Sequence, residues 1–464
     1  MLTYDMEARG GLPLYEYLCN RIREDILSGA LSAGERLPSK RALAEHLRVS
    51  VITVEGAYQQ LEAEGYLTAR PRRGFFAAQV DRLSPPLSVP PELSSPPETP
   101  VWRLDLARNR MDGGLFPSAV WARLTRQVLS EGNLLAPTPH QGLLPLRQAI
   151  AENLRSFRGM AVSPDQIAVG AGAEYLYLLL AQLLGREAVF ALEDPGYPKI
   201  RQVYHKWGAV CRPVPLDSQG VSLEALRASG ADVLHISPAH HYPTGAVTPI
   251  ARRQALLRWA EETGGIIIED DYDSELRFAG RPIPTLQSID RRGRVVYINT
   301  FSQTISPSMR VGFMVLPPAL LERWRQELGF YACTVPALEQ QVLARFLAGG
   351  WYERHLSRLR KVYRTRRAAV LETFSRAFAG RASIMEQGAG LHFLLRLDTD
   401  EDDQTLRNRA EGLGVRLSFL SEYAAVQRPE YAHTLVVNYA GLDLGLLEET
   451  AALLTEAVWG PRPS

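Results

Sequence analysis

The sequence predicts two folded parts of different class, a small α+β module followed by a large α/β domain. Residues 1–80 contain three short segments with apolar residues at helical spacing, and then an alternating apolar segment around a turn. Residues 101–464 instead alternate short β-branched runs with helical patterns, which predicts a parallel or mostly parallel sheet. Residues 81–100 between them are rich in Pro and Ser, so they are expected to form an extended linker.

The composition is that of an ordinary globular protein. The 464 residues suffice for two or three domains, and 46% are hydrophobic and 22% charged. Apolar runs stay shorter than the roughly 18 residues that span a membrane, and the first ten residues lack the apolar core of a signal peptide. A cytoplasmic location without a membrane partner is therefore expected. Three scattered cysteines predict no disulfide framework, and no Cys/His spacing indicates a metal site.

Capping residues define the three helices of the small module. Pro13 suits the first turn of a helix, where its missing N–H needs no partner, and Gly29 ends that helix. Ser39 and Ser50 are N-capping residues for a second and a third helix, and Gly65 follows the third. The apolar residues that recur at helical spacing in the third helix are Val51, Val54, Tyr58 and Leu61.

The segment YLTARPRRGFFAA, residues 66–78, places alternating apolar residues around a basic turn and predicts a β-hairpin. Three helices and a basic hairpin make a winged helix-turn-helix, whose third helix enters the DNA major groove by its first turn. Residues 36–73 carry a net charge of +3, and capped helix N-termini attract phosphates. The alternative is a helical cap that binds nothing. The candidate DNA-contacting residues are Arg36, Ser39, Lys40, Arg41, Ser50, Ile52, Thr53, Arg70, Arg72 and Arg73.

Residues 34–76, GERLPSKRALAEHLRVSVITVEGAYQQLEAEGYLTARPRRGFF, resemble the GntR-type DNA-binding domain. The resemblance covers nearly the whole module. That family commonly has an arginine directly after the serine that begins the third helix, and here the position is Val51. A direct guanine contact at this position is lost, so the resemblance does not predict the operator sequence.

In the large domain, five predicted strands end in loops of polar and small residues. In parallel α/β sheets, functional groups gather in loops at the carboxyl ends of the strands. The segments are QIAVGA (166–171), AVFALEDPGYP (188–198), DVLHISPAHHYPTG (232–245), GGIIIEDDYDSE (264–275) and RVVYINTFSQT (294–304).

The ordered set GAGAEY, EDPGYP, SPAHHYPTG, IIEDDYDSE and TFSQTISPSMR resembles the class I aminotransferases of fold type I, which use pyridoxal 5'-phosphate (PLP). With the GntR-like module in front, the chain resembles the MocR regulators over nearly its full length. The resemblance implies a PLP-dependent transferase-like large domain at 101–464, with effector-binding and dimerisation roles. It also implies a homodimer whose two DNA modules bind two half-sites of a double-stranded operator.

The resemblance implies a PLP site built from several residue types. A helix N-terminus and a cation would hold the phosphate, a carboxylate would keep the ring nitrogen protonated, and hydroxyl and aromatic groups would surround the ring. Lys199 stands where the family often has a basic residue and is a candidate anion contact. Each residue alone also fits a structural role, such as a helix cap or an ion pair. The candidate cofactor-binding residues are Gly172, Ala173, Tyr197, Tyr242, Asp270, Tyr272, Thr300, Ser302, Gln303 and Arg310.

Two positions depart from the aminotransferase pattern. Gln303 occupies the place of the lysine that forms the Schiff base, and a carboxamide cannot form an imine. Val436, in HTLVVNYAG, stands where many class I enzymes have the arginine that binds the substrate carboxylate. Arg416 is nearby in sequence but is not assigned to the site. No catalytic residue is predicted, and standard transamination is not expected.

Four interpretations follow from these residues. The favoured one is a transcription regulator whose large domain senses PLP, a PLP–amino-acid adduct or a related metabolite without covalent attachment. The second is a PLP-dependent aminotransferase with an appended DNA-binding module, which Gln303 argues against. The third is a regulator that no longer binds PLP and uses the large domain only to dimerise. The fourth is that Gln303 replaces a native lysine.

Overall fold

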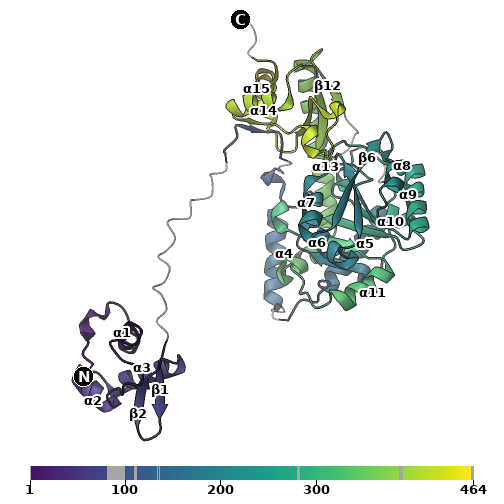
Figure 1. Cartoon of the computed structure of the whole chain (residues 1–464). Helices are drawn as coiled ribbons and strands as arrows, with labels where there is room; N and C mark the ends of the chain where they lie inside the picture. Colours follow the sequence, from purple (N-terminus) through teal and green to yellow (C-terminus); the bar gives the residue numbers. More distant parts are fainter. Residues whose placement is uncertain are drawn as a thin grey trace. The chain divides into compact units, whose positions relative to one another are not determined.

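The computed structural model describes residues 2–460 except 81–99, 109–111, 133, 135, 279–282 and 386–389. The chain forms two compact units, Met1–Pro100 and Val101–Ser464. The predicted linker, residues 81–100, lies outside the described residues except for Pro100. The first unit has the helices and hairpin of a winged helix-turn-helix, and the second is an α/β domain, so the predicted fold classes are confirmed (Figure 1).

The small unit begins its helices where the capping residues predict. The Ser39 hydroxyl accepts the N–H of Ala42, and the Ser50 hydroxyl accepts the N–H of Thr53, so each satisfies a backbone donor of a helix start. The hairpin strands pair antiparallel. The elements are the short 3-10 helix η1 (Met6–Arg9), α1 (Leu14–Ser28), α2 (Lys40–Leu47), α3 (Val51–Ala63), β1 (Leu67–Arg70) and β2 (Gly74–Ala77).

The core of the small unit corrects one expectation about α3. Val54, Tyr58 and Leu61 are buried between α1, α2 and the hairpin, as their spacing predicts. Val51 shares that spacing but is 42% exposed, because it is the first residue of the helix and no other described element of the small unit buries it. The first turn of α3 therefore presents apolar side chains to solvent.

The large unit is built on an eight-stranded sheet in which the five predicted strands are all present. Strands β6, β5, β8, β9 and β10 run parallel in that order, and β11 is antiparallel to its neighbours β10 and β4. The antiparallel β11 was not anticipated. The strands are β4 (Ile167–Gly170), β5 (Val189–Asp194), β6 (Val210–Asp217), β7 (Gly220–Val221), β8 (Val233–Ile236), β9 (Ile266–Asp270), β10 (Val295–Thr300) and β11 (Gly312–Val315).

Helices cover both faces of this sheet. On one face Ile268, Val296 and Ile298 pack against α6 (Ala173–Leu184), α7 (Pro198–Trp207) and α11 (Pro318–Glu327). On the other face lie Ile267 and Tyr297. They pack against the layer formed by α4 (Ser118–Glu131), α5 (Leu144–Arg158), α8 (Leu223–Ala228), α9 (Ile250–Thr263), α10 (Leu286–Ile289), α12 (Ala337–Ala348) and α13 (Trp351–Ala377).

The last part of the chain forms a second core within the large unit, which the sequence did not predict (Figure 1). It joins the main sheet at the carboxyl end of β5, where the buried Asp194 accepts the N–H groups of Ala425 and Val426 at 2.5 and 3.1 Å. Among the described residues, no helix is long and apolar enough to cross a membrane. The elements of this subdomain are β3 (Leu104–Asp105), β12 (Ala382–Met385), β13 (His392–Leu397), α14 (Asp403–Gly412), β14 (Val415–Arg416), the short η6 (Leu420–Tyr423), β15 (Thr434–Asn438) and α15 (Leu447–Trp459).

Candidate functional site

A hydrogen-bonded chain of side chains holds Asp270 at the carboxyl end of β9. The Tyr177 hydroxyl, from α6, donates to Oδ2 of Asp270, and Nε2 of His235, from β8, lies 3.4 Å from the same oxygen. The Tyr204 hydroxyl, from α7, lies 2.8 Å from Nδ1 of His235. Residues of α6 and β8 therefore contact one carboxylate oxygen, Oδ2, and α7 acts on it through His235.

The second oxygen of this carboxylate has no partner. Asp270 is only 5% exposed, and its Oδ1 atom is buried without a hydrogen bond in the described structure. A buried polar atom left unpaired costs stability, so such an atom in a folded protein needs an explanation. An N–H donor from a bound ligand would provide one. A protonated ring nitrogen, as the resemblance implies for PLP, fits this position.

An aromatic cluster lies beside Asp270 and brings together the three tyrosines predicted for the site. The rings of Tyr197 and Tyr242 stand nearly perpendicular at 5.9 Å, and those of Tyr242 and Tyr272 at 6.3 Å. The Tyr272 hydroxyl lies 3.1 Å from His240, and the Tyr242 hydroxyl lies 3.0 Å from that of Tyr423 in η6. Burial raises the pKa of Tyr242 and Tyr272 well above the usual value, so both hydroxyls keep their protons.

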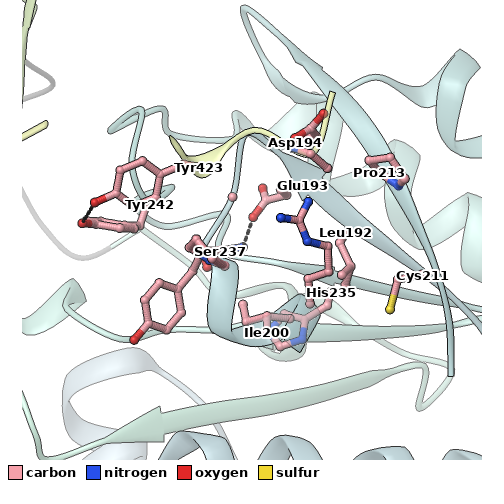
Figure 2. Close-up of a pocket in the computed structure, with 15 residues that line it drawn as sticks. Leu192, Glu193, Asp194, Ile200, Cys211, Pro213, His235, Ser237, Tyr242 and Tyr423 are labelled. Carbon is pink, nitrogen blue, oxygen red and sulfur yellow. Dashed lines mark hydrogen bonds between the residues drawn. The ribbon is translucent and has the colours of Figure 1, made fainter. Parts of the chain in front are cut away.

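A pocket opens next to the cluster, lined by the carboxyl ends of β5 and β8, by Cys211 and Pro213 of β6, and by Tyr423 and Ala425 (Figure 2). His235 lines it and so connects it to Asp270. Glu193 accepts the N–H of Ser237 at 2.9 Å, and burial raises the pKa of the Glu193 carboxyl to about 8. The side chain of Arg201 also lines the pocket and has neither a hydrogen bond nor an ion pair within the part of the chain that is described.

The predicted phosphate-binding residues also lie together, but a carboxylate is among them. A Cβ atom at Gly172, which precedes α6, would lie 2.5 Å from Nη2 of Arg310, so the absence of a side chain lets the guanidinium approach. Arg310 donates to Glu174, whose carboxylate also lies 3.1 Å from Nζ of Lys199. Although partial burial opposes its ionisation, these contacts lower the pKa of Glu174 to about 2. The ring end of the site therefore fits PLP, whereas the phosphate end has a competing anion.

No lysine replaces the missing Schiff-base residue. Gln303 lies in the turn after β10, next to the partly buried Ser302 and beyond the buried Thr300. The chain has only four lysines, and among them Lys199 alone contacts a residue of the candidate site. The neighbouring Tyr197 and Glu174 raise the pKa of Lys199, so its amine stays protonated and is not a nucleophile.

The position expected to hold a substrate carboxylate is apolar. Val436, in β15, is buried with Leu394 and Leu420, and Tyr242 packs against this cluster. Arg416 instead lies 3.7 Å from Asp105 on the neighbouring strand β3. The structure thus supplies no arginine at the position where the class I pattern has one.

In the small unit, the predicted DNA-contacting residues surround the starts of α2 and α3 and the hairpin turn. Lys40 forms an ion pair with Glu55 at 2.6 Å and lies over the ring of Phe75. Arg70 lies over the Phe76 ring at 4.5 Å. Ser50 and Thr53 bond to each other within the helix cap. Four further cations are exposed and make no ion pair with any described residue: Arg36, Arg41, Arg72 and Arg73.

Comparisons with known proteins agree with both folds. The family model for bacterial regulatory proteins of the gntR family matches residues 14–77, and that for aminotransferase class I and II matches residues 103–452. The chain is 33% identical to the probable rhizopine catabolism regulatory protein MocR of Rhizobium meliloti, over 97% of this chain and 94% of that protein. The chain belongs to the MocR-type regulators.

Other relatives of this MocR-type chain cover it similarly. It is 33% identical to the HTH-type transcriptional regulator YdeL of Bacillus subtilis over 97% of both chains. It is 34% identical to the HTH-type pyridoxine biosynthesis transcriptional regulator PdxR of Corynebacterium glutamicum over 88% of both chains. Among solved structures, α-aminoadipate aminotransferase LysN of Thermus thermophilus, complexed with N-(5'-phosphopyridoxyl)-L-leucine, is 27% identical with a TM-score of 0.67 and matches 77% of this chain and 92% of that one.

Several residues of the site were not predicted from the sequence. The hydrogen bonds that hold Asp270 involve Tyr177, His235 and Tyr204, and Glu174 accepts a hydrogen bond from Arg310. A histidine inside an otherwise apolar strand was a usable indication, because a buried imidazole requires a hydrogen-bond partner. No local sequence pattern predicts that Tyr177 contacts the strand that ends at residue 270.

Proposed function

We propose that this chain is a DNA-binding transcription regulator whose large unit binds a PLP-type ligand without a covalent bond and without transamination. One observation carries the ligand assignment: Asp270 is buried and held by partners on one oxygen, and its other oxygen has no donor. Gln303 stands at the position of the lysine that would form a covalent bond with PLP. The site is therefore suited to hold a ring rather than to react with it.

Each retained residue has a definite task in this proposal. Asp270 would accept the ring N–H, the hydroxyls of Tyr242 and Tyr272 would face ring substituents, and Tyr197 would border the ring. When bound, PLP supplies an electron-poor pyridine ring and an aldehyde. Support also comes from LysN, which was solved with a phosphopyridoxyl amino acid, and from PdxR, which is named for pyridoxine biosynthesis.

The Glu174 carboxylate favours a second candidate ligand, a pyridine-type molecule that lacks the phosphate. An ionised carboxylate on Arg310 repels a phosphate dianion, whereas pyridoxal has no charge to place there. Pyridoxal and PLP share the ring nitrogen that Asp270 would hold. A titration in which PLP and pyridoxal compete for the site shows which of the two ligands binds more tightly.

The test is an absorption titration of the full-length protein with PLP, run beside Gln303→Lys and Asp270→Asn. We expect the parent to bind PLP saturably with the spectrum of the free aldehyde, and Gln303→Lys to gain the band of lysine-bound PLP. The Asp270→Asn substitution should weaken PLP binding both in the parent protein and in the Gln303→Lys variant. If none of the proteins binds PLP or pyridoxal, the ligand assignment is wrong and the large unit serves another purpose.

The regulatory step requires that ligand binding alter DNA binding. A ligand shifts an equilibrium between two arrangements only as far as its affinities for them differ. We propose a homodimer with two DNA-binding units on two half-sites. Light scattering gives the mass of the particle, and a DNA titration with and without PLP measures the coupling. A monomer at micromolar concentration, or identical DNA affinities, would contradict this part.

A further inference from the structure

The first turn of α3 presents two apolar side chains to solvent. Val51 is 42% exposed and Ile52 is 79% exposed, although the rest of the helix buries its apolar residues. No other large apolar residue described in the small unit is as exposed as Ile52. An isoleucine at this level of exposure contributes little to the fold, and with Val51 it forms an apolar spot that is available for contact with another molecule.

The polar groups around this apolar spot are already engaged. The hydroxyls of Ser50 and Thr53 bond to each other in the cap, and Ser50 also accepts the N–H of Thr53. Glu55, one turn further and on the same face as Ile52, is neutralised by Lys40 at 2.6 Å. The first turn therefore offers few free hydrogen-bonding groups, and its accessible chemistry is the two aliphatic side chains.

Exposed cations occur in the same unit, at the start of α2 and in the hairpin turn. Arg36 and Arg41, at the approach to α2 and in its first turn, are exposed and have no ion pair among the described residues, and the same holds for the hairpin-turn residues Arg72 and Arg73. Exposed cations without ion pairs, in the same unit as an exposed apolar side chain, suit a polyanion that exposes an apolar group. In the DNA major groove that group is the C5-methyl of thymine, because the other bases present mainly hydrogen-bond donors and acceptors there.

We infer, on the basis of the proposed DNA-binding function, that Ile52 and the adjacent Val51 contact thymine methyl groups and select A·T pairs in each half-site. Valine directly after Ser50 can neither donate to guanine nor accept from cytosine, which leaves methyl contact as its means of discrimination. The selectivity is thus carried by van der Waals contact at the start of α3, and phosphate contacts by the arginines supply affinity without sequence preference.

The experiment uses full-length protein and DNA duplexes selected from a random pool. In a selected duplex, each thymine is replaced in turn by uracil, which keeps base pairing and removes only the methyl group. We expect one or two positions in each half-site at which uracil weakens binding by about three- to fivefold, the effect of one buried methyl group. Ile52→Ala should lose this sensitivity, so that the uracil and alanine changes together cost no more than either alone.

Two further variants control the interpretation. Ile52→Thr keeps a methyl group on a β-branched side chain and should retain part of the uracil sensitivity. Val80→Ala truncates another exposed apolar residue of the same unit, 37% exposed and outside the helices, and should behave like the parent. Because Ile52 is exposed, its variants should melt at the parent temperature, which excludes unfolding as the cause of any loss.

The outcomes separate the inference from the proposed function. If the pool yields no preferred sequence and no DNA binding, the proposed function itself fails. If specific binding is found but uracil has no effect at any position, or if Ile52→Ala keeps the full uracil effect, only the thymine contact is overturned. Loss of a protein–protein contact in Ile52→Ala with unchanged DNA binding would assign the apolar spot to a protein partner instead.

Discussion

The carboxyl group of Glu193 makes the stability of the large unit depend on pH in a way that one substitution isolates. Burial raises its pKa from the ordinary value of 4.5 to about 8. Its polar neighbours are the N–H of Ser237 at 2.9 Å and Nε2 of His241 at 3.5 Å. His241 supplies no positive charge, because burial lowers its own pKa to about 3. The folded protein therefore holds the Glu193 proton more tightly than the unfolded chain does.

The sign and size of the effect follow from that difference. Below about pH 4.5 the Glu193 carboxyl is protonated in both the folded and the unfolded state, so it does not lower the free energy of unfolding. As pH rises, the unfolded chain loses this proton more readily than the folded protein, so the free energy of unfolding falls until the loss levels off above about pH 8. The full difference corresponds to roughly 4–5 kcal/mol of unfolding free energy. Glutamine has a similar shape and does not ionise. The stability of Glu193→Gln relative to the parent should therefore increase by roughly 4 kcal/mol between pH 5 and pH 9.

Denaturant unfolding of the full-length protein measures this quantity. All seven tryptophans lie within residues 101–464, so their fluorescence reports the large unit alone. The other buried acids with raised pKa values, such as Glu269 and Asp273, are present in both proteins and cancel in the comparison. Glu187→Gln, at an exposed site, is the matched control and should show no pH-dependent difference. Equal pH profiles for the parent and Glu193→Gln would refute the argument that Glu193 stays protonated.

Three further outcomes are expected. Glu174→Gln should tighten PLP binding by about tenfold and leave pyridoxal binding unchanged, because it frees Arg310 and removes one negative charge. If the substitution changed PLP and pyridoxal affinity by the same factor, Glu174 would not compete with the phosphate. Arg72→Ala should weaken binding to all DNA sequences and lower the slope of log affinity against log salt by about 1, and an unchanged slope in a gel-shift titration would exclude a phosphate contact. Asp271→Asn leaves the buried charge of Arg158, 2.7 Å away, without its partner, and should cost about 3–5 kcal/mol in denaturant unfolding.

Local chemistry made much of the fold predictable. Ser39 and Ser50 satisfy backbone donors within three residues of themselves, so their helix starts can be predicted without knowledge of the rest of the chain. The strand segments around Asp270 and Thr300 carry β-branched residues followed by polar loops, and parallel pairing then brings those loops to one edge. For this reason Tyr197, Tyr242 and Tyr272 meet although they come from three separate segments.

What remained unpredicted depends on contacts between distant segments. Tyr423 reaches Tyr242 only because the last part of the chain folds back on the sheet edge through Asp194. The partner of Arg310 is Glu174, more than a hundred residues earlier, and no spacing rule connects them. Val51 fits the apolar spacing of α3 yet is exposed, because periodicity defines a face and cannot say whether another element covers its end.

Val436, which departs from the aminotransferase pattern, and Asp270, which keeps it, differ physically, and the difference bears on whether a ligand is still bound. At Val436 the expected charged position is apolar and packed, which is the least costly filling of a site that no longer binds a carboxylate. At Asp270 a carboxylate stays buried with one oxygen unpaired, a state that costs roughly 1–3 kcal/mol unless a donor completes it. A site without any ligand would gain stability from an apolar residue at both positions. The persistence of the costly group at Asp270 favours a bound ring and argues against a large unit that serves only dimerisation.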